Sequence, residues 1–390
     1  MAGERFVIAG GGTGGHLVPA LNLAAALGRA DASARVTVVG AERGIEARVL
    51  PESGLSWSLL PMEPLRRSRP WRNWRVAATA PRVLGGLRRL FRDVAPDVVV
   101  GTGGYASGPV VLYGILTGRA TALQEQNAQP GLVTRWLAPR VDRVYLGYPE
   151  AAGRLRPGRR TVVHAWGNPV APPTAGAPDP EEFRWPAGRV VAVIGGSQGA
   201  RGLNERLLRD LEASDRWPEG VSLVWVAGPA HHAAVADRVE RLPVAPRIRV
   251  VPWVPDLGRR LTGLTLAIGR AGAMFCAELA AAGVPAVLVP FPAAAADHQR
   301  RNAAALADAG AAVLREEERL RDGELWETVT SLLADESRRA AMSRAMAERG
   351  RPEAADRIAR DLVELAATGG RRSGGRRVEG AAPAEGADRG

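Results

Sequence analysis

Short apolar runs alternate with longer stretches of helical periodicity through most of the 390-residue chain. The runs are rich in Val, Ile, Leu and Ala and end in glycine or other turn formers, which is typical of buried strands. They form two series: Arg5–Ala9, Arg35–Gly40, Asp97–Gly101 and Ala120–Glu125, then Arg189–Gly195, Val221–Ala227, Leu264–Ile268 and Pro285–Val289. Because strands that alternate with helices form parallel sheets covered on both faces, the pattern predicts an α/β fold.

A stretch rich in Pro, Ala and Gly, Val170–Pro180, separates the two series and predicts an interdomain linker. We therefore expect one domain over residues 1–168 and a second over residues 169–340. Helical patterns follow over residues 341–368, and the sequence leaves open whether these helices return to the first domain. Residues 369–390 contain almost no large apolar side chain, so we expect a disordered tail.

The composition limits the partners and the cellular location that we expect for this protein. The net charge is +11 and none of the 52 basic residues is lysine, which favours anionic partners, although GC-rich codon usage also produces an arginine excess. A single cysteine, Cys276, excludes an intramolecular disulfide and a multi-cysteine metal site. The start of the chain lacks a signal-peptide pattern, and every long uncharged stretch is broken by glycine or proline. We expect no membrane span and a cytoplasmic location.

Three glycine-rich loops each connect a predicted strand to a predicted helix. They read GGGTGGHLVPA from Gly10, GTGGYASGP from Gly101 and GGSQGARGLNE from Gly195. In such loops the backbone N–H groups and the positive end of the helix bind anions. Their recurrence at equivalent places predicts binding of phosphates or sugar phosphates.

Other phosphate-binding classes fit less well. A Walker loop requires a lysine, which this chain lacks. A dinucleotide site requires an acidic residue at the end of the second strand, where Gly40 and Ala41 stand and Glu42 comes late. The chain has no Asp-x-Asp pair, so phosphate charge would be balanced by helix ends and side chains. We expect neither a metal nor another cofactor.

Seven motifs together resemble the MurG family, which transfers N-acetylglucosamine from a UDP-sugar to lipid I in peptidoglycan synthesis. The resemblance covers Arg5 to Ala312, and the motifs occur in the family's order: GGTGGHLVPA from Gly11, GTGGYASGP from Gly101, QEQNAQPGL from Gln124, GNPV from Gly167, GGSQGA from Gly195, GRAGAMFCAEL from Gly269 and DHQRRNA from Asp297. It implies a GT-B fold, in which two Rossmann-like domains with parallel sheets face a central cleft. The acceptor binds the N-terminal domain and the donor binds the C-terminal domain.

The resemblance also implies the partners. They are UDP-N-acetylglucosamine as the donor substrate, the undecaprenyl-pyrophosphoryl acceptor lipid I, and the anionic inner face of the cytoplasmic membrane, with no nucleic acid. The protein would be peripheral at the cytoplasmic face of that membrane. The glycine loops would also serve another GT-B transferase with a lipid acceptor or a UDP-sugar 2-epimerase, but the asparagine motif and the GGSQGA loop favour the cell-wall enzyme. A further alternative is an inactive nucleotide-sugar-binding paralogue, which Ala171 supports.

The donor residues that the resemblance implies cluster after predicted strands. Glu278 would bond the ribose, Val254 beside Trp253 would bond the uracil, and Gln299 would bond the sugar hydroxyls. A carboxylate near a helix start can instead only compensate the helix dipole. The complete expected set is Thr13, Gly14, Gly15, Asn127, Ser197, Val254, Ala273, Met274, Phe275, Cys276, Ala277, Glu278 and Gln299.

On the acceptor side, His16 follows the first glycine loop and is the candidate general base, because a neutral imidazole accepts a hydroxyl proton near neutral pH. A histidine at a helix start can alternatively only bond backbone. The phosphate loops of this side are expected at Gly11, Gly12, Gly103, Gly104 and Tyr105. The implied reaction is an inverting displacement, in which the muramyl C4 hydroxyl attacks the anomeric carbon and UDP leaves.

The chain departs from the family pattern at three positions. Ala171 stands where the motif GNPVR has arginine, Gln124 where HEQN has histidine, and Phe275 where threonine is common. The missing arginine removes a positive charge on the donor side, and Arg270 is a candidate to replace it.

One segment, Leu65 to Arg92, contains nine arginines and no acidic residue. Tryptophans and aliphatic residues lie between them, a combination that binds anionic membrane surfaces. The residues expected to face the membrane are Arg66, Arg67, Arg69, Trp71, Arg72 and Trp74. The alternative is a helix whose apolar face packs into the core and whose arginines are solvated.

Overall fold

The computed structural model describes residues 3–64, 70–171, 183–196, 199–214, 216–254, 256–369 and 378–379. The chain forms two compact units. The first unit comprises Met1–Pro169 and Glu353–Gly390, and the second comprises Val170–Pro352. The boundary after Pro169 lies one residue from the one expected.

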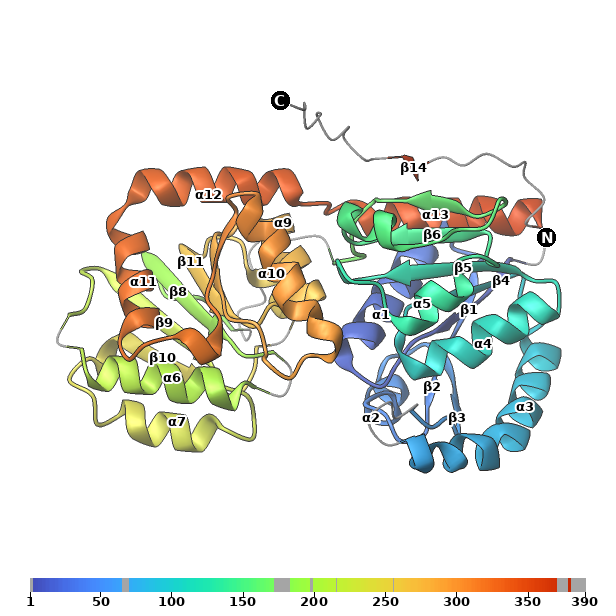
Figure 1. The fold of residues 1–390 in the computed structure, drawn as a ribbon, viewed down its shortest axis with the longest axis horizontal. Coiled ribbons are helices and arrows are strands. Elements are labelled where there is room, and N and C mark those ends of the chain that lie inside the picture. Colours follow the sequence, from blue (N-terminus) through green and yellow to red (C-terminus); the bar gives the residue numbers. More distant parts are fainter. Residues whose placement is uncertain are drawn as a thin grey trace, which may run out of the picture. The chain divides into compact units, whose positions relative to one another are not determined.

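The first unit contains a parallel sheet with the strand order β14-β7-β6-β5-β4-β1-β2-β3 (Figure 1). Central strand β1 pairs with β2 on one side and β4 on the other, with Phe6 opposite both Val36 and Val98. The strand order therefore reverses between β1 and β4, and ligands of open α/β sheets bind at such a reversal. The strands are β1 (Arg5–Ala9), β2 (Arg35–Ala41), β3 (Ser56–Leu60), β4 (Val98–Gly101), β5 (Ala120–Glu125), β6 (Arg143–Leu146), β7 (Val162–His164) and β14 (Val378–Glu379).

Helices cover both faces of this sheet because successive strand residues point to opposite sides. Val7 and Ala9 of β1 pack with the helices α3 and α4, whereas Phe6 and Ile8 pack with α1 and α13. The helices of the first unit are α1 (Gly14–Ala30), α2 (Glu46–Val49), α3 (Trp74–Val94), α4 (Gly104–Leu116), α5 (Leu132–Leu137) and α13 (Ala354–Thr368), with short 3-10 turns at Leu50–Glu52, Pro70–Asn73 and Pro149–Arg154.

Helix α13 brings the end of the chain back to the first unit. Its buried Ile358 and Leu362 share one core with residues of α1. Asp361 accepts hydrogen bonds from the Tyr145 hydroxyl and from Nε of Arg143, the latter at 3.1 Å. The expected range of returning helices, 341–368, is too long, because residues 341–352 belong to the second unit. There α12 (Glu336–Arg349) buries Met342 and Met346.

The expectation of disorder over residues 369–390 does not hold for Val378 and Glu379. These two residues form β14, which pairs in parallel with Val163 and His164 of β7. Without them β7 would be an edge strand with unpaired backbone groups. Backbone pairing requires no apolar side chain, so the composition of the tail did not reveal it.

The second unit contains a parallel sheet with the order β10-β9-β8-β11-β12-β13, which reverses between β8 and β11. The strands are β8 (Arg189–Ile194), β9 (Val221–Val226), β10 (Ile248–Val251), β11 (Leu266–Gly269), β12 (Ala286–Leu288) and β13 (Ala312–Leu314). The helices are α6 (Arg201–Glu212), α7 (His232–Val239), α8 (Leu257–Arg260), α9 (Ala273–Ala282), α10 (His298–Asp308), α11 (Glu324–Ala334) and α12, with 3-10 turns at Ala245–Arg247, Ala295–Asp297 and Glu317–Arg319. The α/β class and the two parallel sheets predicted from the sequence are confirmed.

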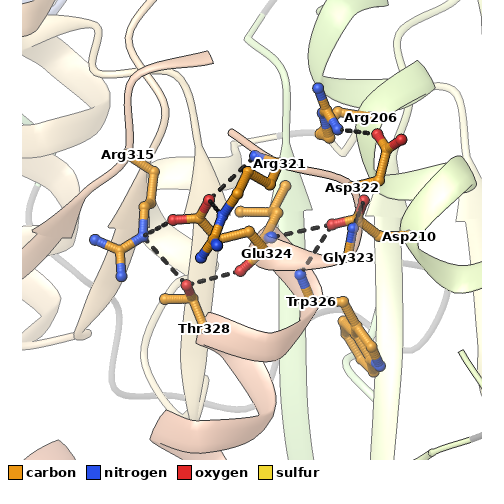
Figure 2. A network of polar contacts seen from close by, with 10 residues as sticks. Arg206, Asp210, Arg315, Arg321, Asp322, Gly323, Glu324, Trp326 and Thr328 are labelled. Carbon is orange, nitrogen blue, oxygen red and sulfur yellow. Dashed lines mark hydrogen bonds and ion pairs between the residues drawn. The ribbon is translucent and has the colours of Figure 1, made fainter. Parts of the chain in front are cut away.

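A buried carboxylate joins α6 to the start of α11 (Figure 2). Asp210 is only 1% exposed and accepts backbone N–H bonds from Gly323 at 2.9 Å, Leu325 at 3.0 Å and Trp326 at 3.1 Å. The first N–H groups of a helix lack partners within the helix. Asp210 therefore caps α11 from another element.

We expect Asp210→Asn to lower the free energy of unfolding by about 1 to 2 kcal/mol, because the charge and one acceptor oxygen are lost from the cap. The melting temperature should fall by roughly 2 to 8 °C in thermal unfolding. The matched control is Asp322→Asn, which removes the ion pair with Arg206 from a side chain that is 83% exposed. Equal effects of the two variants would contradict the assigned capping role.

Candidate functional site

The first two glycine loops meet at the reversal between β1 and β4. A Cβ at Gly104, whose φ is +74°, would overlap the carbonyl oxygen of Gly11. A Cβ at Gly12, whose φ is +90°, would lie 2.7 Å from Cε1 of Tyr105. Both positions require glycine because of the backbone conformation and the lack of space. The structure thus brings together the five residues expected to form the acceptor loops.

His16 lies at the same place, in the first turn of α1, and is partly exposed. Its Nδ1 is 3.0 Å from Oγ1 of Thr13, and its carbonyl oxygen accepts a hydrogen bond from the Thr102 hydroxyl at 2.8 Å. A Cβ at Gly103 would lie 2.7 Å from Cδ2 of the imidazole and 3.2 Å from Nε2. The ring is therefore bordered by both glycine loops. Gly14 and Gly15 open the same helix.

A buried glutamate, which the sequence analysis did not single out, supports the first loop. Glu46 is 0% exposed, and its Oε1 accepts the backbone N–H of Gly12 at 2.6 Å. Burial raises the pKa of the Tyr105 phenol, and the nearby carboxylates of Glu46 and Glu63 raise it further. Gly40 and Gly44 precede Glu46 outside the seven motifs, so the sequence did not mark this residue as a support of the first loop.

Asn127 is held in a turn by a second carboxylate that the sequence analysis missed. Glu125 is 3% exposed and accepts hydrogen bonds from the Asn127 backbone at 3.1 Å, the Gly131 backbone at 2.8 Å and the Thr134 hydroxyl at 2.6 Å. The Asn127 side chain also donates to Glu125 at 3.3 Å. The turn after β5 is therefore fixed by one side chain.

Gln124, which replaces the family's histidine, belongs to a buried network of amides. It donates to Oδ1 of Asn168 at 2.9 Å and accepts from Gln126. Gln126 also donates to the Thr102 carbonyl at 2.7 Å, and Asn168 donates to the Gln126 carbonyl at 3.0 Å. The network connects the β5 loop to the second glycine loop through neutral groups alone.

In the second unit, the expected donor residues lie at the carboxyl ends of parallel strands. Met274 and Phe275 stand in the first turn of α9, which follows β11, and the N–H of Cys276 donates to the Gly272 carbonyl at 2.9 Å. Val254 is buried and the adjacent Trp253 is 60% exposed, both after β10. Ala273 and Ala277 belong to the same helix start, whereas Ser197 lies outside the described residues. The reversal between β8 and β11 is where such sheets bind ligands.

Glu278 and Gln299 border this region. Glu278 is partly buried beside α8, where a Cβ at Gly258 would lie 2.7 Å from its Cδ. Burial raises the pKa of the Glu278 carboxyl to about 7. Oε1 of Gln299 accepts the backbone N–H of Phe291 at 2.9 Å and so supports the loop after β12. Among the described residues, no group of three His, Cys, Asp or Glu side chains could hold a metal ion.

Comparison with known proteins identifies the family. The glycosyltransferase family 28 N-terminal domain matches residues 6–146, and the family 28 C-terminal domain matches residues 190–358. The chain belongs to glycosyltransferase family 28. It is 39% identical over 374 residues to the UDP-N-acetylglucosamine--N-acetylmuramyl-(pentapeptide) pyrophosphoryl-undecaprenol N-acetylglucosamine transferase of Moorella thermoacetica, covering 94% of this chain and 100% of that relative.

Further comparisons agree with this family 28 assignment. A protein of the same name from Sorangium cellulosum is 40% identical over 363 residues, covering 92% of this chain and 88% of the relative. The crystal structure of Acinetobacter baumannii MurG has a TM-score of 0.69 at 27% identity, covering 93% of this chain and 99% of that one. The resemblance to the MurG family and the GT-B fold are confirmed.

In this family 28 transferase, Arg270 is engaged within the second unit. It is 7% exposed, donates to the carbonyls of Val289 and Pro290, each at 3.1 Å, and forms an ion pair with Glu317. Its guanidinium lies 5.5 Å from the centroid of the Phe291 ring. All three polar contacts are made through Nη1 and hold the guanidinium within the second unit. That Arg270 replaces the arginine that Ala171 lacks stays a prediction.

The arginine-rich segment of this family 28 transferase divides into exposed and buried parts. Trp71 is 71% exposed and Trp74 is 65% exposed. Arg66, Arg67 and Arg69 lie outside the described residues, as does the side chain of Arg72. The apolar residues of α3 that pack into the core are Val83, Leu87, Leu90 and Phe91. Core packing is thus confirmed for the apolar residues of α3, whereas a membrane-facing role of Trp71 and Trp74 stays a prediction.

Proposed function

We propose that this chain transfers N-acetylglucosamine from UDP-N-acetylglucosamine to the C4 hydroxyl of the muramyl sugar of undecaprenyl-pyrophosphoryl-MurNAc-pentapeptide. The products are lipid II and UDP, and the configuration at the anomeric carbon is inverted. The observation that carries the proposal is the similarity, over 94% of the chain, to a transferase named for this reaction. The reversal of strand order in each sheet, where ligands of open α/β sheets bind, supports it.

On the acceptor side, His16 accepts the proton of the attacking hydroxyl. A proton on Nδ1, donated to the Thr13 hydroxyl, places the ring's lone pair on Nε2, on the side bordered by Gly103. The hydroxyl oxygen forms a bond to the anomeric carbon as its proton moves to Nε2. The bond from the anomeric carbon to the UDP oxygen breaks, and UDP leaves with the electron pair.

On the donor side, the start of α9 and the third glycine loop stabilise the diphosphate, whose negative charge increases as UDP departs. The carboxylate of Glu278 accepts hydrogen bonds from the ribose hydroxyls. Backbone groups of Val254 recognise the uracil, with Trp253 beside it. Gln299 bonds the sugar hydroxyls, and its bond to Phe291 orients its amide. These roles account for charge stabilisation without a metal.

The lipid tail of the acceptor must remain in a bilayer, so the first unit, which binds the acceptor, must have a surface that contacts the membrane. Trp71 and Trp74 supply exposed aromatic rings at the start of α3. Helix α4 packs beside α3, as the edge-to-face contact between the rings of Phe91 and Tyr113 shows, with ring centroids 4.7 Å apart. Helix α4 also carries Leu116, which is 74% exposed. Within the described residues, no helix is long and apolar enough to cross a membrane. We therefore place the protein peripherally at the cytoplasmic face of the cell membrane.

We expect the double variant Trp71→Ala/Trp74→Ala to bind anionic vesicles at least about tenfold more weakly, because the interfacial apolar contact is lost. Added salt should release the wild type, and Arg-to-Gln changes at Arg66, Arg67, Arg69 and Arg72 should weaken its binding. Vesicle sedimentation measures both effects, with Trp253→Ala in the second unit as the control. Binding that ignores salt and all of these changes would contradict the assigned surface.

A transfer assay with UDP-N-acetylglucosamine and a short-chain lipid I analogue tests the function. The expected products are the β-1,4-linked disaccharide lipid and UDP. Protection by UDP against thermal unfolding, stronger than that by ADP, is a parallel measure of donor binding. UDP protection without any transfer would indicate an inactive nucleotide-sugar-binding protein, and transfer only to a different lipid would indicate another acceptor. Conversion of the free donor to its 2-epimer would indicate an epimerase.

A further inference from the structure

Glu46 is a buried carboxylate at the acceptor loops, and the mechanism above does not use it. It belongs to α2, is 0% exposed, and receives one short hydrogen bond, from the N–H of Gly12 to Oε1 at 2.6 Å. The N–H of Ala41, at the end of β2, is 3.5 Å from the same oxygen. Oε2 is buried and has no hydrogen-bond partner among the described residues. Burial of a carboxylate oxygen without a hydrogen-bond partner costs free energy, so a role for this side chain must offset that cost.

The surrounding backbone is shaped to accept this side chain. A Cβ at Gly11 would overlap Oε1, and a Cβ at Gly44 would overlap Oε2. A Cβ at Gly40 would lie 2.6 Å from the Cβ of Glu46. Three glycines, one in β2 and two in the loops after β1 and β2, thus leave the space that one carboxylate fills. If this position only filled the core, an apolar side chain would do so without the free-energy cost of burying a carboxylate.

The contacts of Glu46 lead to the candidate base in two steps. Glu46 holds the N–H of Gly12, which directly precedes Thr13 in the chain. The hydroxyl of Thr13 lies 3.0 Å from Nδ1 of His16. The Gly12 N–H donates to Glu46 and therefore does not donate to an acceptor phosphate. Its bond instead fixes the geometry of the loop that binds the phosphate. A charge-assisted bond is about twice as strong as a neutral one, which suits it to hold a glycine turn.

We propose that Glu46 is a positioning residue for the acceptor half of the reaction, fixing the Gly11–Thr13 turn and, through the Thr13 hydroxyl, the tautomer and orientation of the His16 ring. This inference rests on the proposed role of His16 as the base. It assigns Glu46 no contact with substrate. The carboxylate acts on turnover only through the loop.

Kinetics of Glu46→Ala, Glu46→Gln and Thr13→Val test the proposal. Glu46→Ala should lower kcat roughly 10- to 100-fold, as expected for a misplaced catalytic group, and this loss should be larger than any change in the KM for UDP-N-acetylglucosamine. Glu46→Gln retains an acceptor for the Gly12 N–H and should recover part of the loss. Thr13→Val should lower kcat as well. The double variant Glu46→Ala/Thr13→Val should lose less than the product of the single effects, because both act along one path.

The matched control is Asp361→Asn, which removes a carboxylate that bonds Tyr145 and Arg143 in the same unit. It should lower the melting temperature and leave kcat unchanged where the protein is folded. A folded Glu46→Ala variant with wild-type kcat would overturn the proposal. Full activity of Thr13→Val would overturn it as well, and this variant carries little folding risk because Thr13 is exposed.

A measurement without substrate separates this proposal from the proposed function. The chain has only 5 histidines, so nitrogen chemical shifts of labelled imidazoles can be assigned. The His16 ring should favour the Nδ1–H tautomer in the wild type and lose that preference in Glu46→Ala. An unchanged His16 signal would overturn the positioning role even if transfer occurs. A wild type that shows the expected tautomer but no transfer would instead contradict the proposed function.

Discussion

Replacement of His16 by alanine should lower the turnover of N-acetylglucosamine transfer roughly 100- to 10,000-fold, which is the range that general base catalysis supplies. The imidazole is held by Thr13 and bordered by the second glycine loop, so no other described histidine shares this position. The variant should still bind UDP, because the expected donor contacts of the second unit are untouched. Turnover at saturating substrates and thermal protection by UDP measure the two effects.

The control for this variant is His232→Ala, at the start of α7 in the second unit. It removes an imidazole without touching the acceptor loops and should leave turnover unchanged. If His16→Ala retains near-normal turnover, the proton is accepted by another group. If it loses UDP protection, His16 instead supports donor binding.

The affinity for UDP-N-acetylglucosamine should rise about tenfold between pH 6 and pH 8, because the ribose hydroxyls donate to the ionised form of Glu278. Burial raises the pKa of this carboxyl to about 7, so much of it is protonated at neutral pH before the donor binds. The sugar nucleotide suits this titration because its diphosphate is a diester without the terminal phosphate proton of UDP. Isothermal calorimetry across this range measures the effect.

Substitution separates Glu278 from other titrating groups. Glu278→Gln should abolish the pH dependence, and Glu278→Ala should weaken donor binding roughly 10- to 100-fold, as for a lost bond to a charged group. Without donor, the raised pKa means that stability is lost as the pH rises from about 4.5 through 7. An equal pH slope in Glu278→Gln would assign the titration to a different residue.

The sequence predicted best the strands that end at a clear turn signal such as a glycine loop. The strands β1, β4 and β8 are apolar and each ends at a glycine loop, so both their type and their carboxyl ends were predictable. The strands that were not predicted are β3, β6, β7, β10, β13 and β14. β7 and β13 have only three residues each, and β3 exposes its tryptophan. Such strands are fixed by pairing with neighbours, which a local pattern does not record.

The candidate site was predictable only where chemistry and motif coincide. Parallel strands place their carboxyl ends at one edge, so the meeting of Gly11 with Gly104 followed from the loops. Glu46 and Glu125 were not predicted because a lone acidic residue gives no sign that it will be buried against backbone N–H groups. In α3 the buried Val83, Leu87 and Leu90 follow helical spacing, and that spacing could not distinguish a core face from a membrane face.

The return of α13 to the first unit affects the order of events during synthesis. Helix α1 buries Leu23 and Leu27 in a core that α13 completes, but α13 leaves the ribosome more than 180 residues after Pro169. At bacterial elongation rates this delay is roughly 10 to 40 s, long enough for the second unit to fold first. During that interval the nascent chain exposes an unfinished apolar surface. A nascent protein of this kind is a natural client for ribosome-associated chaperones, and a stop codon near its end would leave that surface permanently open.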